Sequence, residues 1–138
     1  MTAQGHEHGV LDTSTVISLG RVADVSGLPR IPLITTVTLA ELSVGPLVAR
    51  DDDERARRQA HLQEAEADFD VLPLDVEAAR AFARVAAGLR RSGRKRAARA
   101  FDALIAATAL AQDLPLYTSN PADFEGIDDL EVVPVQLA

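Results

Sequence analysis

Short, mostly apolar runs alternate with longer amphipathic stretches along this chain. Such a run is typical of a parallel strand that is covered on both faces. In the longer stretches, apolar positions recur three or four residues apart, which predicts helices. We expect strands at residues 10–11, 33–36, 69–72, 115–118 and 130–133, and helices at 13–21, 38–48, 51–68, 76–91 and around 101–108. Because strands and helices alternate, the sequence predicts an α/β fold with a parallel sheet and helices on both of its faces.

The 138 residues fit a single domain, which we place at residues 9–138 after a flexible N-terminal tail of residues 1–8. No apolar run approaches the roughly 18 residues that span a bilayer, and the N-terminus lacks the basic and apolar regions of a secretory signal. We therefore expect a cytoplasmic protein with no membrane partner. Because the chain has no cysteine, disulfides, thiolate zinc sites and cysteine nucleophiles are excluded.

The formal net charge of −7 argues against non-specific binding of nucleic acid over the whole surface. The charge is unevenly distributed, since residues 90–99 read RRSGRKRAAR and form a local basic run. Within it, Arg94, Lys95 and Arg96 are candidates for steering RNA phosphates, and a solvated basic loop is the alternative interpretation. The predicted helix at residues 51–68 is strongly charged, which indicates either a solvated face or a clamp for a partner chain.

Three acidic residues fall where an α/β fold gathers ligand-binding groups, and a fourth interrupts an apolar helix. Asp12 directly follows the first predicted strand, and Glu41 lies one turn into the helix after the second. Asp123 follows the fourth strand, and Asp102 interrupts the apolar helix that precedes that strand. In open α/β sheets the ligand crevice lies outside the carboxyl ends of the strands, so acids placed there tend to collect.

Three of these acids also have an ordinary structural interpretation as helix caps. Asp12 can cap the first helix. Glu41 matches the last position of a capping box that begins at Thr38. Asp123 matches an acid in a helical first turn that Asn120 caps.

Asp102 is harder to explain as a cap, because Asp is a poor residue for a helix interior and its neighbours at helical spacing are mostly alanine. Two structural alternatives stay open. Asp102 forms an ion pair with Arg99, or the helix starts late, near Ala100, and leaves Asp102 in its first turn.

If the four acids converge, their charges need a counterion. Two carboxylates about 5 Å apart repel by roughly 3 kcal/mol at an effective dielectric constant of about 20. A hard divalent cation removes this repulsion, and carboxylate ligands without His or Cys favour Mg²⁺ or Mn²⁺. Such ions meet phosphate oxygens and activate water, which makes phosphodiester hydrolysis the natural chemistry. Phosphate-binding loops, nucleophile elbows and zinc-protease motifs are absent from the sequence.

Four segments carry these acids in order: LDTS at residues 11–14, TLAEL at 38–42, FDALIAATA at 101–109 and LYTSNPADF at 116–124. Together they resemble the PIN-domain ribonucleases, with the closest likeness to the VapC toxins of type II toxin–antitoxin pairs. The resemblance implies a three-layer α/β/α sandwich with a short central parallel sheet. It also implies a site for Mg²⁺ or Mn²⁺ and endonucleolytic cleavage of RNA.

The resemblance also assigns roles to individual residues. Asp12 and Asp102 would be the principal metal ligands, and Glu41 would bind the ion or one of its waters. Asp123 would complete the site directly or through water, although some relatives carry their acid at the position of Asn120. Residues expected to orient ligands or waters from behind this shell are Ser14, Thr118 and Asn120.

The partners that the resemblance implies are an RNA substrate, a second copy of the chain in a homodimer, and a cognate VapB-type antitoxin. That antitoxin would place an arginine near the acids and would contact the helices at residues 38–48 and 51–68. Two other hypotheses stay open. The chain is a catalytically impaired PIN-like module that binds RNA or protein, or it is an unrelated α/β interaction domain in which the acids are only caps.

Overall fold

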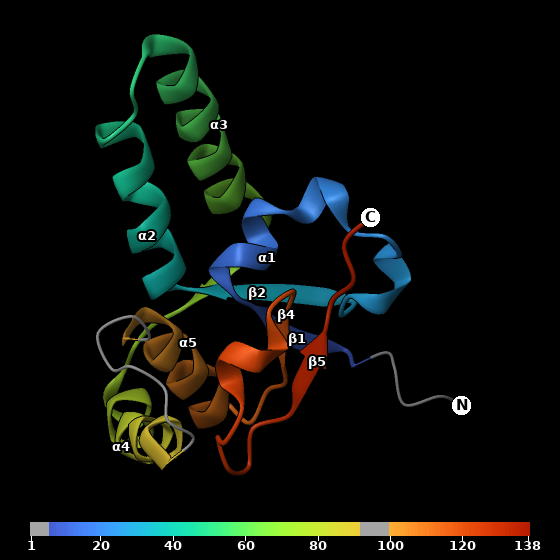
Figure 1. The fold of residues 1–138 in the computed structure, drawn as a ribbon, viewed down its shortest axis with the longest axis vertical. Helices are drawn as coiled ribbons and strands as arrows, with labels where there is room; N and C mark the ends of the chain where they lie inside the picture. Colours follow the sequence, from blue (N-terminus) through green and yellow to red (C-terminus); the bar gives the residue numbers. More distant parts are fainter. Residues whose placement is uncertain (1–5, 92–99) are drawn as a thin grey trace.

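The computed structural model describes residues 6–91 and 100–138, which form a five-stranded parallel sheet with helices on both faces (Figure 1). The strands are β1 (His8–Leu11), β2 (Ile31–Thr35), β3 (Asp70–Leu72), β4 (Leu116–Thr118) and β5 (Val132–Pro134). Their order in the sheet is β3-β2-β1-β4-β5, and every neighbouring pair is parallel. The predicted three-layer α/β/α class is confirmed.

Within the described residues, five α-helices connect and cover the strands: α1 (Thr13–Ile17), α2 (Thr36–Leu47), α3 (Asp52–Asp68), α4 (Val76–Arg91) and α5 (Ala100–Ala111). Short 3₁₀ helices follow at η1 (Leu19–Arg21), η2 (Val25–Gly27) and η4 (Pro121–Phe124). The helix predicted at residues 13–21 is therefore shorter than expected, because the chain tightens into a 3₁₀ turn after Ile17. In the described part of the chain, no helix is long and apolar enough to cross a membrane.

The neighbouring strands β1 and β4 contribute side chains to two hydrophobic cores, one on each face of the sheet. Successive side chains of a strand point to opposite faces. Val10 and Leu116 pack into a core with α4 and α5, whereas Leu11 and Tyr117 pack into a second core with α1, α2 and α3. Because both faces are covered, both strands are almost fully buried, which explains why they read as continuous apolar runs.

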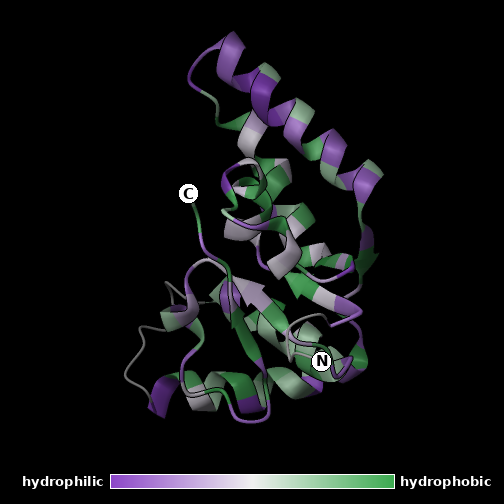
Figure 2. Cartoon of the chain, turned by 90° about the vertical axis from the view of Figure 1, so that its right-hand side faces the viewer, coloured by the Kyte–Doolittle hydropathy of each residue, from purple (hydrophilic) through white to green (hydrophobic). Residues whose placement is uncertain are grey.

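Helices α2 and α3 form a hairpin that projects from the sheet (Figure 1), and α3 is largely hydrophilic (Figure 2). Asp51 caps α3 by accepting a 2.8 Å hydrogen bond from the Glu54 amide. Glu54 in turn accepts from the Arg50 amide at 2.9 Å and forms ion pairs with Arg50 and Arg58. The Arg58 guanidinium also donates to the Gly45 carbonyl at 2.9 Å, so this network ties α3 to the C-terminal end of α2.

The first strand begins one residue before the boundary that we predicted between the N-terminal tail and the domain. Strand β1 begins at His8, and the residues before it already pair with the chain leading into β2. The His6 carbonyl accepts from the Arg30 amide at 3.2 Å, and the Glu7 carbonyl accepts from the Ile31 amide at 2.8 Å. Of residues 6–8, only His8 belongs to β1, while these two backbone hydrogen bonds tie His6 and Glu7 to the chain that leads into β2.

Candidate functional site

The candidate site lies at the point where the order of the strands reverses. From β1 the chain proceeds through β2 to β3 on one side of the sheet, then returns to β4 and β5 on the other. Between β1 and β4, connections therefore leave in opposite directions, and such a switch point opens a crevice at the carboxyl ends of the two strands. Asp12 directly follows β1, and Thr118 is the last residue of β4.

The Asp12 carboxylate is buried among neutral donors. It is 3% exposed and caps α1, since Oδ1 accepts from the Thr15 amide at 3.0 Å. Its other oxygen, Oδ2, accepts from the Thr118 hydroxyl at 2.7 Å. The Ser14 hydroxyl lies 3.2 Å from Oδ1 and 3.1 Å from Oδ2 and donates to both.

None of these donors carries a positive charge. Over residues 6–91 and 100–138, no Lys, Arg or His forms an ion pair with Asp12. Within the described residues, this buried carboxylate is therefore stabilised by hydrogen bonds from neutral groups and not by an ion pair, so a bound cation would be its countercharge. A carboxylate surrounded by hydroxyl oxygens also has the donor chemistry that Mg²⁺ and Mn²⁺ prefer, so the residues fit such an ion.

Hydroxyl and amide groups from two distant segments form a network around Asp12. The Asn120 side chain donates through Nδ2 to the Ser14 hydroxyl at 3.2 Å, and the Asn120 amide donates to Thr118 Oγ1 at 2.9 Å. Ser14 and Ser119 also approach each other, with 3.3 Å between their hydroxyl oxygens. The structure thus brings together Ser14, Thr118 and Asn120 as the sequence predicts, while their effect on a bound ion stays a prediction.

The capping interpretation of Asn120 is confirmed for its position, with Pro121 as the first helical residue, but not for its side chain. It occupies the N-cap position of η4 but makes no side-chain capping bond there, and its amide group instead turns to Ser14. By contrast, the cap expected for Asp12 is confirmed. Capping needs only one of its oxygens, however, and it does not explain the contact of the other oxygen with Thr118 across the sheet.

Glu41 is linked to the Asp12 segment by Thr13, a residue whose role was not predicted from the sequence. Thr13 donates from its hydroxyl to Glu41 Oε1 at 2.6 Å, and its oxygen lies 2.9 Å from that of Thr38. The capping box predicted for Thr38 and Glu41 is wrong, because Thr35 caps α2 and accepts from the Thr38 amide at 3.2 Å. The available signal was the position of Thr13 directly after Asp12.

The other two acids are half-buried. Asp102 lies in the first turn of α5, and Asp123 lies in η4, which packs against α5. Among the residues placed by the structure, no three His, Asp or Glu side chains stand close enough to hold a metal ion together. The convergence of all four acids on one ion therefore stays a prediction. The candidate RNA contacts Arg94, Lys95 and Arg96, and the Arg99 proposed to pair with Asp102, lie outside the described residues.

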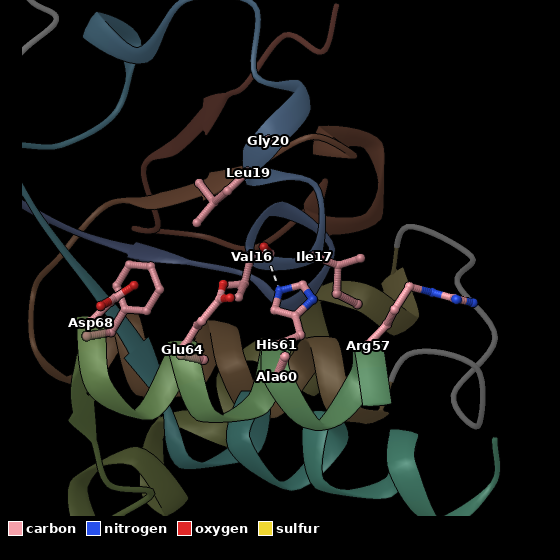
Figure 3. A pocket seen from close by; sticks show the side chains of 11 residues that line it. Val16, Ile17, Leu19, Gly20, Arg57, Ala60, His61, Glu64 and Asp68 are labelled. Carbon is pink, nitrogen blue, oxygen red and sulfur yellow. Dashed lines mark hydrogen bonds between the residues drawn. The ribbon is translucent and has the colours of Figure 1, made fainter. Parts of the chain in front are cut away.

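A separate pocket of about 400 Å³ lies between α1, η1 and α3 (Figure 3). The His61 side chain projects from α3 toward α1, and its Nε2 atom lies 3.2 Å from the Val16 carbonyl oxygen. None of the four acids lines this pocket. Its lining is formed by Val16, Ile17, Leu19, Gly20, Arg57, Ala60, His61, Glu64, Ala65, Asp68 and Phe69.

Comparisons with known proteins identify the family of this chain. Residues 10–130 match the PIN domain family. The chain is 43% identical over 129 residues to Ribonuclease VapC5 of Mycobacterium tuberculosis, covering 92% of this chain and 93% of that protein. It is 30% identical over 132 residues to Ribonuclease VapC of Rickettsia bellii, covering 93% and 96% of the two chains.

A solved structure supports the same assignment. The fold superposes with a TM-score of 0.81 and 40% identity on a chain in the crystal structure of VapBC-5, a toxin–antitoxin system of Mycobacterium tuberculosis. The match covers 94% of this chain and 99% of that chain. With its acids in the expected order around a parallel sheet, and with relatives matched over nearly its whole length, this chain belongs to the PIN-domain family and to the VapC proteins within it.

Proposed function

We propose that this chain is a Mg²⁺- or Mn²⁺-dependent endoribonuclease that hydrolyses RNA phosphodiester bonds and acts as the toxin of a type II toxin–antitoxin pair. The observation that carries the proposal is the buried Asp12 carboxylate, which lies at the strand switch point among neutral donors only. The matched relatives from Mycobacterium tuberculosis and Rickettsia bellii are named as VapC ribonucleases, which supports this activity.

In this proposal Asp12 and Asp102 are the principal metal ligands, and Glu41 and Asp123 bind the ion directly or through its waters. When bound, Mg²⁺ or Mn²⁺ would activate water and offset the charge that develops on the phosphate. The chain itself holds the Asp12 carboxylate in one orientation, because the hydroxyls of Thr118 and Ser14 donate hydrogen bonds to its oxygens. No residue is required as a covalent nucleophile.

For its partners we propose a VapB-type antitoxin and a second copy of the chain. The matched crystal structure is one of a toxin–antitoxin system, which supports the first. From the sequence we expect the antitoxin contact on α2 and α3, and the pocket between α1, η1 and α3 offers a concave, partly apolar surface beside α3. Antitoxin bound there would still have to reach the acids, which lie outside the pocket, in order to block them.

The test is cleavage of tRNA, rRNA and mRNA by the purified protein with added Mg²⁺ or Mn²⁺ and with EDTA. Asp12→Asn and Asp102→Asn should each lower cleavage by more than about 100-fold, since even indirect disturbance of a metal site lowers activity by about 10- to 100-fold. The matched control is Asp53→Asn, which removes an exposed carboxylate of α3 and should cut as the parent does. Undiminished cleavage by either site variant would overturn the proposal.

A second candidate function is that of an impaired module that binds RNA without cutting it. The specific observation behind it is Asn120, a neutral residue where some relatives carry an acid, which donates to Ser14 instead of offering a carboxylate. This candidate predicts RNA binding by the parent with no metal-dependent cleavage. It also predicts that Asn120→Asp creates or strongly increases cleavage.

A further inference from the structure

Thr13 directly follows Asp12 in the sequence, and its hydroxyl contacts Glu41, the next acid of the candidate site. Thr13 is the first residue of α1, which Asp12 caps. Its Oγ1 lies 2.6 Å from Glu41 Oε1 and 2.9 Å from Thr38 Oγ1. Thr38 is fully buried, and Thr13 and Glu41 are half-buried. These contacts are therefore shielded from most of the competing water.

The direction of the hydrogen bonds in this group is fixed. An ionised carboxylate only accepts, so Thr13 must donate its single hydroxyl hydrogen to Glu41. Thr13 then has only lone pairs left for Thr38, so Thr38 must be the donor of that pair. The result is a one-way chain from Thr38 through Thr13 to Glu41. A separation of 2.6 Å falls within the range of charge-assisted O–H···O⁻ hydrogen bonds.

Because Thr13 is bonded covalently to Asp12, its contact with Glu41 also links Glu41 to Asp12. Asp12 and Thr13 are consecutive, and Asp12 is itself held by Thr15, Ser14 and Thr118. Thr38 and Glu41 lie three residues apart on α2, which puts them on one helix face. The hydroxyl of Thr13 is thus the hydrogen-bonded link between the strand that positions Asp12 and the helix that positions Glu41.

The contact also leaves half of the Glu41 carboxylate available. Oε1 accepts the bond from Thr13, whereas Oε2 accepts no hydrogen bond from the chain within residues 6–91 and 100–138. A glutamate side chain has three rotatable bonds, and fixing one oxygen restricts all three. A single hydroxyl can therefore decide where the second oxygen is presented.

We propose that Thr13 is a positioning residue, whose hydroxyl, oriented by Thr38, holds the Glu41 carboxylate in place beside Asp12 so that both act on the same divalent cation. This inference rests on the proposed function, because it assumes that Asp12 and Glu41 serve one ion. Thr13 acts through Glu41 and does not itself touch the substrate.

A purely structural role for Thr13 makes different predictions. If the hydroxyl only joins α1 to α2, its loss lowers the unfolding temperature and leaves metal affinity unchanged in the folded protein. If it positions Glu41, its loss weakens metal binding at temperatures well below the unfolding transition. Metal binding by the folded protein without RNA is therefore the readout that separates the two roles.

The experiment measures Mn²⁺ binding to the full chain by isothermal titration calorimetry, together with kcat, KM and thermal unfolding. The variants are Thr13→Val, which keeps the shape but removes the hydroxyl, Thr13→Ser, Thr38→Val and Glu41→Gln. Ser43→Ala is the control, because Ser43 is an exposed hydroxyl of α2 that bonds to the Leu39 carbonyl of its own helix.

We expect Thr13→Val to weaken Mn²⁺ binding by about tenfold, the size typical of losing a group that orients a metal ligand. Thr13→Ser should restore the parent affinity, and Thr38→Val should have a smaller effect in the same direction. In the Glu41→Gln background, Thr13→Val should have little further effect, since the two changes remove one interaction.

Parent-like Mn²⁺ affinity in folded Thr13→Val would overturn the positioning role while leaving the nuclease proposal intact. A full effect of Thr13→Val in the Glu41→Gln background would overturn it as well. If the parent binds no Mn²⁺, or if Glu41→Gln and Asp12→Asn leave binding and cleavage unchanged, the proposed function itself fails, and the inference fails with it. Should Thr13→Val not fold, Thr38→Val takes its place, with parent-like Mn²⁺ affinity as the overturning result.

Discussion

The hydroxyl of Thr118 donates a 2.7 Å hydrogen bond to Oδ2 of Asp12 across 106 positions of sequence. The pairing of β1 with β4 makes this contact possible, since it sets Leu11 opposite Tyr117 and thereby brings the two following residues together. Both groups are buried. The sheet therefore positions the acid that the proposed chemistry depends on.

Replacing Thr118 should test how much that contact contributes. Thr118→Val keeps the shape of the side chain but removes the donor, and a hydrogen bond to a charged group contributes about 2 kcal/mol. We expect the free energy of unfolding, measured in urea without metal, to fall by about that amount and RNA cleavage to fall at least tenfold. Thr118→Ser keeps the donor and should stay close to the parent in both measurements. A Val variant as stable and active as the parent would contradict the importance of the contact.

The Glu54 network predicts how the stability of the α2–α3 hairpin depends on pH. Hydrogen bonds from the Arg50 amide and guanidinium, together with the charge of Arg58, lower the pKa of Glu54 from 4.5. Since the folded-state pKa is the lower one, the unfolded state binds the proton more readily. The stabilisation is complete above about pH 4.5 and is lost as the pH falls through the folded pKa.

Glu54→Gln should therefore flatten this acid dependence. The measurement is the urea midpoint between pH 3 and pH 7 for the parent and the variant, with Asp53→Asn as the matched control on the same helix turn. We expect the two curves to differ most at neutral pH and to approach each other in acid. A constant difference across this range would mean that the charge of Glu54 is not what stabilises the hairpin.

Gly88 allows α4 to approach the loop before β5. A Cβ atom at this position would lie 2.4 Å from the Gly126 carbonyl oxygen, a backbone atom that cannot rotate away. Gly88→Ala should lower the free energy of unfolding by about 1–3 kcal/mol through overpacking, although alanine is the better helix former. Gly27→Ala is the control, because a Cβ atom added there would meet no other atom within 4 Å. Equal unfolding midpoints for the two variants would show that the loop moves freely.

Ile17 offers a way to separate antitoxin binding from catalysis. It is 57% exposed, lines the pocket between α1, η1 and α3, and lies outside the acid site. Ile17→Glu should weaken binding of the cognate antitoxin by at least about tenfold, since it places a charge in an apolar contact. RNA cleavage and thermal unfolding should stay unchanged. Antitoxin affinity equal to that of the parent would place the contact elsewhere.

Much of the architecture follows from local pattern. The apolar runs around Val10, Ile34 and Leu116 predict buried parallel strands, since only such strands can be apolar on both faces. Asp51 and Asp75 each precede a helix, and both accept hydrogen bonds from amides three residues on, as Asp at a helix N-cap does. These features depend on a few neighbouring residues, so the sequence alone determines them.

The geometry of the site depends on contacts between residues far apart in the chain, and local sequence patterns do not contain these contacts. The sequence placed Asp12 as a candidate because it follows the first strand, and the resemblance to PIN-domain ribonucleases added Ser14, Thr118 and Asn120. For Glu41 and Asn120, the sequence did not separate a capping role from a role in the site, because a capping motif has the same spacing whether or not its hydrogen bond forms. Only the packing of α1 against α2 decided that Thr13 meets Glu41, because that hydrogen bond joins residues 28 positions apart.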